Sequence, residues 1–166
     1  MQTIPVKNLP ALWSFSSNFS EPSCYFHLPG SFITVSIKDQ YKYSALTSKI
    51  IGCAIAVHKI LSNGFQEVIY QRALEIEMRI AGLSFSREHE MPIFYNKEII
   101  GSRRVDFLVE GVIIVELKAI TSLEDVHLAQ AINYLEVYNL EIGLLINFGE
   151  GSLNFKRLTN KKYKAV

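Results

Sequence analysis

The segment from Val105 to Lys118 limits the possible folds most, because its two apolar strands contain three charged side chains, Asp106, Glu116 and Lys118. Nine residues separate Asp106 from Glu116, and eight of these nine are apolar or glycine. Burying an ionised group without a partner is costly, so these charges require a specific explanation. Side chains alternate along a strand, which places Glu116 and Lys118 on the same face. The simplest chemical account is a metal ion held by two carboxylates, with a lysine beside it.

The turn between the two strands decides whether Asp106 and Glu116 can meet. In an antiparallel hairpin the numbers of paired residues add up to a constant, so a two-residue turn at Glu110 and Gly111 would put the two carboxylates on opposite faces. A three-residue turn, with Gly111 in the left-handed conformation, would place Asp106 directly opposite Glu116. We therefore predict the three-residue turn.

Composition sets broad limits on the class of protein. A chain of 166 residues that is 49% hydrophobic can form one domain with a substantial core. The net charge of +1 gives no global polycation signal for nucleic acid, although a local basic groove remains compatible with it. Two cysteines fit neither a disulfide framework nor a zinc site, so a reducing, cytoplasmic setting is expected. No run approaches the roughly 18–20 apolar residues of a membrane span, so no membrane association is expected.

The chain divides into two parts by its residue patterns. Residues 1–42 hold four of the five prolines and show no sustained period, which predicts an irregular or weakly ordered extension. Residues 43–166 read as one domain with the element order α-α-β-β-β-α-β-β. The two helices cover 44–64 and 65–83, and the third covers 122–140. The strands are expected at 84–95, 98–110, 112–120, 141–151 and 153–163. This order predicts an α/β fold with a mixed central β-sheet flanked by helices, and the apolar 112–120 strand at its centre.

The residue types in the central stretch favour a hard divalent cation. Two carboxylates held close together repel one another, and a bound cation removes that repulsion. Oxygen ligands favour Mg²⁺ or Mn²⁺ over zinc. Lys118 could then orient an attacking water or stabilise developing negative charge. The structural alternative is an ion pair between Lys118 and Asp106 or Glu116.

Two predicted helices carry further candidate residues. Glu67 and Tyr70 lie three residues apart and share a helical face, although a carboxylate in the first turn is also favoured by the helix dipole. His127, Gln130 and Tyr134 lie on one face of the last helix. Amide and phenol groups there suit contacts to a phosphate backbone or to the carboxylates, and the alternative is an ordinary polar edge.

The motif Gly64-x-x-Glu67-x-x-Tyr70 resembles the signature of the bacterial GxxExxY protein family. The likeness extends from about residue 47 to residue 157 and includes the segments 91–120 and 129–149. That family is similar to a branch of the PD-(D/E)XK nuclease-like superfamily, which implies a restriction-endonuclease-like core. Two positions depart from the expected pattern: Val105 stands where the superfamily's name implies proline, and Ser62 stands where an extra glycine is common.

The resemblance implies roles for the candidate residues. Asp106, Glu116 and Lys118 would be catalytic, with Glu67 as a further acidic residue; Glu67, Asp106 and Glu116 would hold the metal. Gln130 and Tyr134 look like the Gln-x-x-x-Tyr element of RecB-like nucleases and would bind substrate, together with Tyr70. Independently of the resemblance, four basic residues are candidate phosphate contacts in a nuclease, with a solvated surface charge as the alternative for each: Lys97, Arg103, Arg104 and Lys156.

Three functional hypotheses follow from these observations. The first is an Mg²⁺-dependent nuclease that hydrolyses phosphodiester bonds, with DNA as the expected substrate. The second is a non-catalytic nucleic-acid-binding or accessory protein that keeps the nuclease-like fold. The third is an interaction domain in which the charges form a buried ion-pair network.

Overall fold

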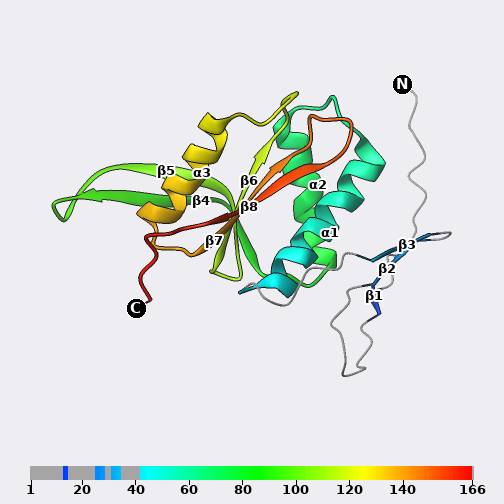
Figure 1. The fold of residues 1–166 in the computed structure, drawn as a ribbon, viewed down its shortest axis with the longest axis horizontal. Coiled ribbons are helices and arrows are strands. Elements are labelled where there is room, and N and C mark those ends of the chain that lie inside the picture. The colour runs from blue at the N-terminus through cyan, green and yellow to red at the C-terminus, as the bar shows by residue number, and fades with distance from the viewer. Residues whose placement is uncertain (1–12, 15–24, 29–30, 35–41, 166) are drawn as a thin grey trace. The chain divides into compact units, whose positions relative to one another are not determined.

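A computed structural model of the protein describes residues 13–14, 25–28, 31–34 and 42–165 (Figure 1). The chain forms two units, Met1–Ser48 and Lys49–Val166, which are described separately. The first contains a small antiparallel sheet in the order β1-β2-β3, formed by β1 (Trp13–Ser14), β2 (Tyr25–Leu28) and β3 (Ser31–Thr34). Most of residues 1–42 lie outside the described ranges, so the prediction of an irregular or weakly ordered extension stays a prediction.

The elements from α1 onward follow the predicted order α-α-β-β-β-α-β-β. The helices are α1 (Ser44–Leu61), α2 (Glu67–Ile80) and α3 (Asp125–Val137). The strands are β4 (Phe85–Tyr95), β5 (Glu98–Val109), β6 (Ile113–Lys118), β7 (Ile142–Asn147) and β8 (Asn154–Thr159).

The five strands β4 to β8 form one mixed sheet in the order β4-β5-β6-β7-β8. Strands β6 and β7 are parallel and joined through α3, and the other neighbours are antiparallel. In Figure 1, α3 lies on one side of the sheet, and α1 and α2 lie on the other. With both faces covered, β6 occupies the centre, and its residues 113–117 are all buried, as the apolar sequence predicts.

No segment apolar and long enough for a membrane span is expected from the sequence. Helix α1 nevertheless meets the length and composition criteria for one. A helix buried in a protein core meets the same criteria. The inward residues of α1, including Ile50, Ala54 and Val57, are buried in the domain core. The free thiol of Cys53 is buried there too, and burial raises its pKa to about 12, so it stays protonated. Packing in the core accounts for the apolar composition of this helix.

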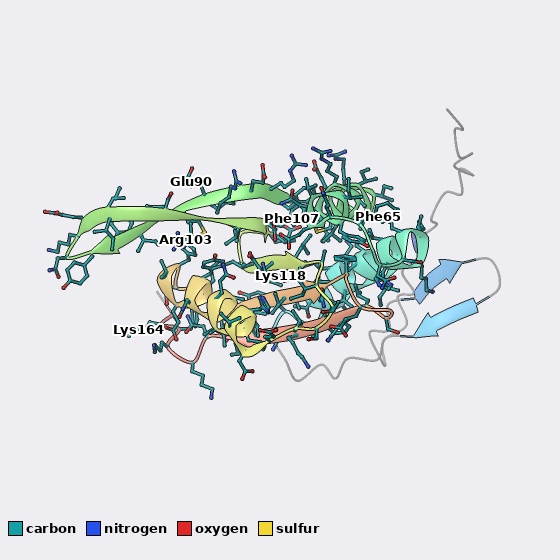
Figure 2. The ribbon with its side chains drawn as sticks, turned by 90° about the horizontal axis from the view of Figure 1, so that it is seen from above. Phe65, Glu90, Arg103, Phe107, Lys118 and Lys164 are labelled. Carbon is teal, nitrogen blue, oxygen red and sulfur yellow. The ribbon has the colours of Figure 1, made fainter. Side chains whose placement is uncertain are left out.

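Strands β4 and β5 form a long hairpin that turns at Asn96 and Lys97, as predicted. Both turn residues have positive φ angles (48° and 72°), which suits a tight two-residue turn. The outer part of this hairpin, residues 91–104, projects beyond the other strands and is called the arm below (Figure 2).

The turn between β5 and β6 has the predicted odd length. Phe107 pairs with Val115, Leu108 with Ile114 and Val109 with Ile113, and every pair adds up to 222. Gly111 has a φ of 68°, as expected, and Glu110 is also left-handed at 51°. The same register puts position 106 opposite position 116, one step beyond the last pair. The geometric condition for a shared site is therefore met.

Replacing Gly111 with alanine should destabilise the protein by about 1–2 kcal/mol, because its left-handed φ strains any residue with a Cβ. No atom lies within 4 Å of the added Cβ, so the effect would be purely conformational. Gly101→Ala is the matched control, since that position is equally open and has no positive φ. Chemical denaturation measures the free energy of unfolding of both variants. Equal stabilities for the two variants would contradict the turn geometry.

Candidate active site

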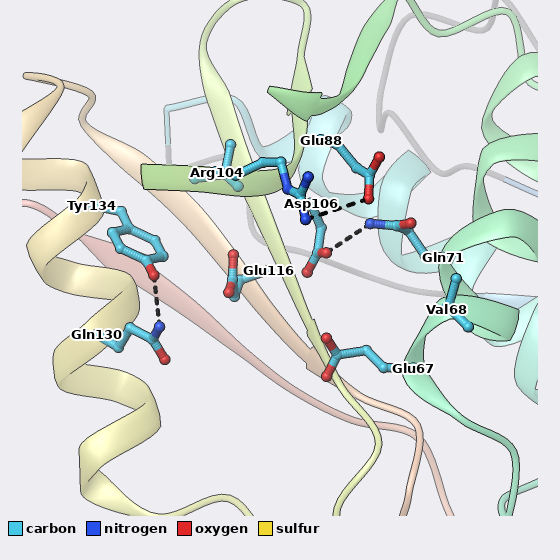
Figure 3. A pocket seen from close by; sticks show the side chains of 10 residues that line it. Glu67, Val68, Gln71, Glu88, Arg104, Asp106, Glu116, Gln130 and Tyr134 are labelled. Carbon is cyan, nitrogen blue, oxygen red and sulfur yellow. Dashed lines mark hydrogen bonds and ion pairs between the residues drawn. The ribbon is translucent and has the colours of Figure 1, made fainter. Parts of the chain in front are cut away.

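A pocket of about 310 Å³ lies where β5 separates from β6 (Figure 3). The three carboxylates predicted from the sequence line it, and Glu88 is a fourth: Glu67 lies at the start of α2, Asp106 on β5 and Glu116 on β6. The other lining residues are Val68, Gln71, Glu88, Arg104, Val105, Gln130 and Tyr134. Residues far apart in the sequence thus meet at one place, as the predicted site requires.

The Asp106 side chain is fixed by hydrogen bonds to both of its oxygens. The Leu117 backbone N–H donates to Oδ2 at 2.7 Å, and the Gln71 Nε2 donates to Oδ1 at 2.8 Å. Backbone pairing between the strands ends at Phe107 and Val115, so the carboxylate of Asp106 accepts the next N–H of β6. This arrangement orients Asp106 before any ligand arrives.

Glu116 is 6% exposed, and its two oxygens differ in their surroundings. Oε1 accepts a hydrogen bond from Lys118 Nζ at 3.2 Å. Oε2 is buried and has no hydrogen-bond partner among the described residues. An unsatisfied buried carboxylate oxygen is costly, and such groups mark sites where a ligand belongs. Burial, with the nearby charge of Asp106, raises the pKa of Glu116 to about 7.

The charges in the pocket perturb one another. Burial raises the pKa of Glu67, and Asp106 adds to the rise while Lys118 opposes it. Burial also raises the pKa of Asp106, although the hydrogen bonds from Leu117 and Gln71 lower it. Burial alone would lower the pKa of Lys118, but Glu116 and Glu67 raise it above its ordinary value. Lys118 is therefore a cation at neutral pH, and it takes part in the predicted structural ion pair with Glu116.

The substrate-binding candidates separate into two groups. Gln130 and Tyr134 line the pocket, and Gln130 Nε2 donates to Tyr134 Oη at 2.6 Å. Tyr70 lies elsewhere and is fully buried, with its ring stacked on Phe148 at a centroid distance of 4.6 Å. Its hydroxyl donates to the Ser62 carbonyl and accepts the Phe65 N–H. A side chain without exposed surface does not contact substrate, so the structure corrects the prediction for Tyr70.

The hydroxyl of Tyr70 instead holds the loop before α2, where Ser62 has a φ of 56°. A left-handed backbone at this position explains why glycine is compatible with it. His127 also has a structural role, because its Nδ1 accepts the Glu124 N–H and completes a capping box at the start of α3.

Two polar residues of the pocket were not predicted from the sequence. Gln71 lies one helical turn after Glu67, so the i, i+4 spacing could have revealed it. Glu88 lies on β4 opposite Asp106, between the pairs Arg87–Phe107 and His89–Val105. Its φ of 51° is strained for a residue other than glycine, and the regular pairing of β4 with β5 skips this position. No sequence pattern signals that distortion. Arg104 forms a long ion pair of 3.9 Å with Glu88.

The donor groups suit a hard divalent cation, since they are carboxylate oxygens and one of them is buried without a partner. Within the described ranges, no three His, Cys, Asp or Glu side chains are arranged as a ready-made metal site. Mg²⁺ commonly uses only one or two carboxylates and completes its shell with water and substrate phosphate. The pair Asp106 and Glu116 meets that smaller requirement.

A comparison with family models identifies the chain. Residues 44–158 match the model of the PD-(D/E)XK nuclease superfamily, and the chain belongs to that superfamily. This match confirms the predicted restriction-endonuclease-like fold. The finer assignment to the GxxExxY proteins stays a prediction.

Two further comparisons add little. No curated protein matches the chain. A solved structure, that of SSO0001, is similar at 16% identity with a TM-score of 0.46; the alignment covers 71% of this chain and 60% of that one. A likeness at this level supports no argument about function.

Glu116→Gln should change how stability depends on pH. The pKa of Glu116 is raised from 4.5 to about 7 in the folded protein, so folding binds a proton between these values. The associated stability is present below pH 4.5 and is lost as pH rises to about 7. In EDTA, the variant should therefore be more stable than the wild type at pH 8, by roughly 1–3 kcal/mol, and similar to it at pH 4.5.

Thermal unfolding at both pH values measures this difference. Glu98→Gln, at an exposed position on β5, is the control, and its stability relative to wild type should be the same at both pH values. A Glu116→Gln variant less stable than wild type at pH 8 would contradict the assignment of a buried, unsatisfied charge.

Proposed function

We propose that the protein is a divalent-metal-dependent nuclease that hydrolyses phosphodiester bonds, with DNA as its substrate. One observation carries the proposal: the buried Oε2 of Glu116, without a partner among the described residues, in the same pocket as Asp106 and Glu67. Membership in the nuclease superfamily supports the reaction class.

Asp106 and Glu116 would hold Mg²⁺ or Mn²⁺, with Glu67 as a third acidic group from the helix side. The cation, when bound, supplies charge to polarise a phosphate and lowers the pKa of a bound water. Asp106 is suited to this task because its orientation is already fixed by Gln71 and Leu117. Glu116 is suited because a cation would satisfy its buried oxygen and favour its ionised form.

Lys118 would act as a hydrogen-bond donor and positive charge, because the carboxylates around it keep it protonated. Its ammonium could hold a water or a phosphate oxygen next to Glu116, where negative charge develops during hydrolysis. Gln130 and Tyr134 form the opposite wall of the pocket, and their amide and phenol groups could bind the backbone of the substrate.

The alternative is a non-catalytic nucleic-acid-binding protein that keeps the nuclease-like fold. The two functions differ in their response to metal and in cleavage, so two experiments separate them.

Mg²⁺ or Mn²⁺ should raise the melting temperature, because a ligand that binds only the folded state stabilises it. The expected gain is about 2.7 kcal/mol at a metal concentration roughly 100 times Kd. Asp106→Asn should abolish this shift. Asp125→Asn, an exposed change at the start of α3, is the control and should preserve it. A wild-type protein whose melting temperature does not respond to either cation would contradict the metal site.

Lys118→Met should lower the rate of DNA cleavage roughly 100-fold or more, since it removes a charge beside the reacting groups. Lys162→Met is the matched control, because Lys162 also forms an ion pair, with Glu136 at 2.8 Å, but on the exposed surface. Cleavage of labelled single-stranded and duplex DNA with Mg²⁺ and Mn²⁺ provides the measurement. A wild-type protein inactive on all substrates, or equal losses in both variants, would contradict the proposal.

Gln71→Met should weaken metal binding, because Asp106 loses one of the two hydrogen bonds that orient it. The expected loss is roughly 10-fold or more in metal affinity, measured by titration calorimetry. Arg72→Met, at the adjacent exposed position on α2, is the control. Unchanged affinity in Gln71→Met would show that Leu117 alone is sufficient to orient Asp106.

A further inference from the structure

A second hollow, of about 320 Å³, lies between the arm and α3. It is lined by Ile93, Arg103, Val126, Ala129, Gln130, Asn133, Tyr134, Val137 and Tyr138. Gln130 and Tyr134 line both this groove and the candidate active site. The hydrogen-bonded pair therefore forms the boundary between the acidic pocket and a mostly apolar groove that continues along the arm.

The groove has apolar walls that remain accessible. Val126 is 64% exposed and Val137 is 48% exposed, both on α3, and Ile93 faces them from the arm. Tyr138 also lines the groove, and its hydroxyl donates to the Met91 carbonyl at 2.9 Å, which connects the end of α3 to the arm.

Positive charge accompanies the apolar surface. Arg103 lines the groove, and its neighbour Arg104 lines the acidic pocket. Figure 2 shows Arg103 between the arm and α3. Two consecutive arginines thus line two adjoining hollows, and guanidinium groups bind phosphates well.

We propose that this groove binds single-stranded DNA next to the cleavage site, an inference that rests on the proposed nuclease function. A strand whose phosphate lies in the acidic pocket would have its neighbouring nucleotides beside Gln130 and Tyr134, at the entrance of the groove. Bases of a single strand expose their faces, which pack favourably on aromatic and apolar side chains. In a duplex those faces are covered by stacking, so the apolar walls would have no partner.

The test measures binding of the full chain, in EDTA, to fluorescent oligonucleotides by anisotropy, so it does not depend on cleavage. Wild type should bind single-stranded DNA at least about 10-fold more tightly than a duplex of the same sequence. Val137→Glu, which places a negative charge in the groove, should weaken single-strand binding roughly 10-fold. Arg103→Ala should reduce the slope of log affinity against log salt by about 1.

Matched controls lie on α2, outside the groove. Ile76→Glu changes a residue of similar exposure (52%), and Arg79→Ala removes another surface arginine; both should leave DNA binding unchanged. The proposal is overturned if wild type binds no DNA, prefers duplex or RNA, or binds equally well after Val137→Glu. Loss of binding in Val137→Glu together with an inactive wild type would support the groove and reject the nuclease function. If wild type cleaves DNA and Val137→Glu binds it as tightly as wild type does, the nuclease function is supported and the groove is rejected.

Discussion

The hydrogen bond from the Leu117 N–H to Asp106 is the interaction on which the candidate site depends. It occurs where β5 leaves β6, and a side chain there takes the place of a backbone acceptor. The central strand keeps its N–H satisfied, and the two strands can diverge enough to form a pocket. Asp106 and Glu116 both line that pocket, and Lys118, on the other side of Leu117, forms an ion pair with Glu116. A regular hairpin continued by one more pair would leave no such opening.

Burying the carboxylates of this pocket lowers the free energy of unfolding. Glu67, Asp106 and Glu116 have raised pKa values for which burial is the largest cause, and Lys118 compensates part of their charge. A domain selected for stability alone would place apolar residues here, as it does along the rest of β6. Groups perturbed in this way, collected in one cleft, are typical of functional sites.

The sequence predicted those parts of the structure that follow from periodicity and from the geometry of turns. The eight-element order, the central position of β6 and the three-residue turn at Gly111 all depend on local patterns or on arithmetic of the register. The contact of Gln71 with Asp106 joins residues 35 positions apart, and the distorted backbone at Glu88 leaves no mark in residue type. Tyr70 was misassigned because a helical face shared with Glu67 says nothing about depth. Its burial against Phe148 depends on the far end of the chain.

Helix α3 connects the parallel strands β6 and β7; it supplies Gln130 and Tyr134, and Tyr138 follows its last residue. The distance between the acidic pocket and the far end of the groove is therefore set along one helix, whose C-cap Tyr138 is hydrogen-bonded to the arm. If a strand is held in the groove while it is hydrolysed, the bond that breaks lies at a constant number of nucleotides from the held segment. In every product, the cleaved end would then lie at the same number of nucleotides from the held segment, whatever the sequence of the strand.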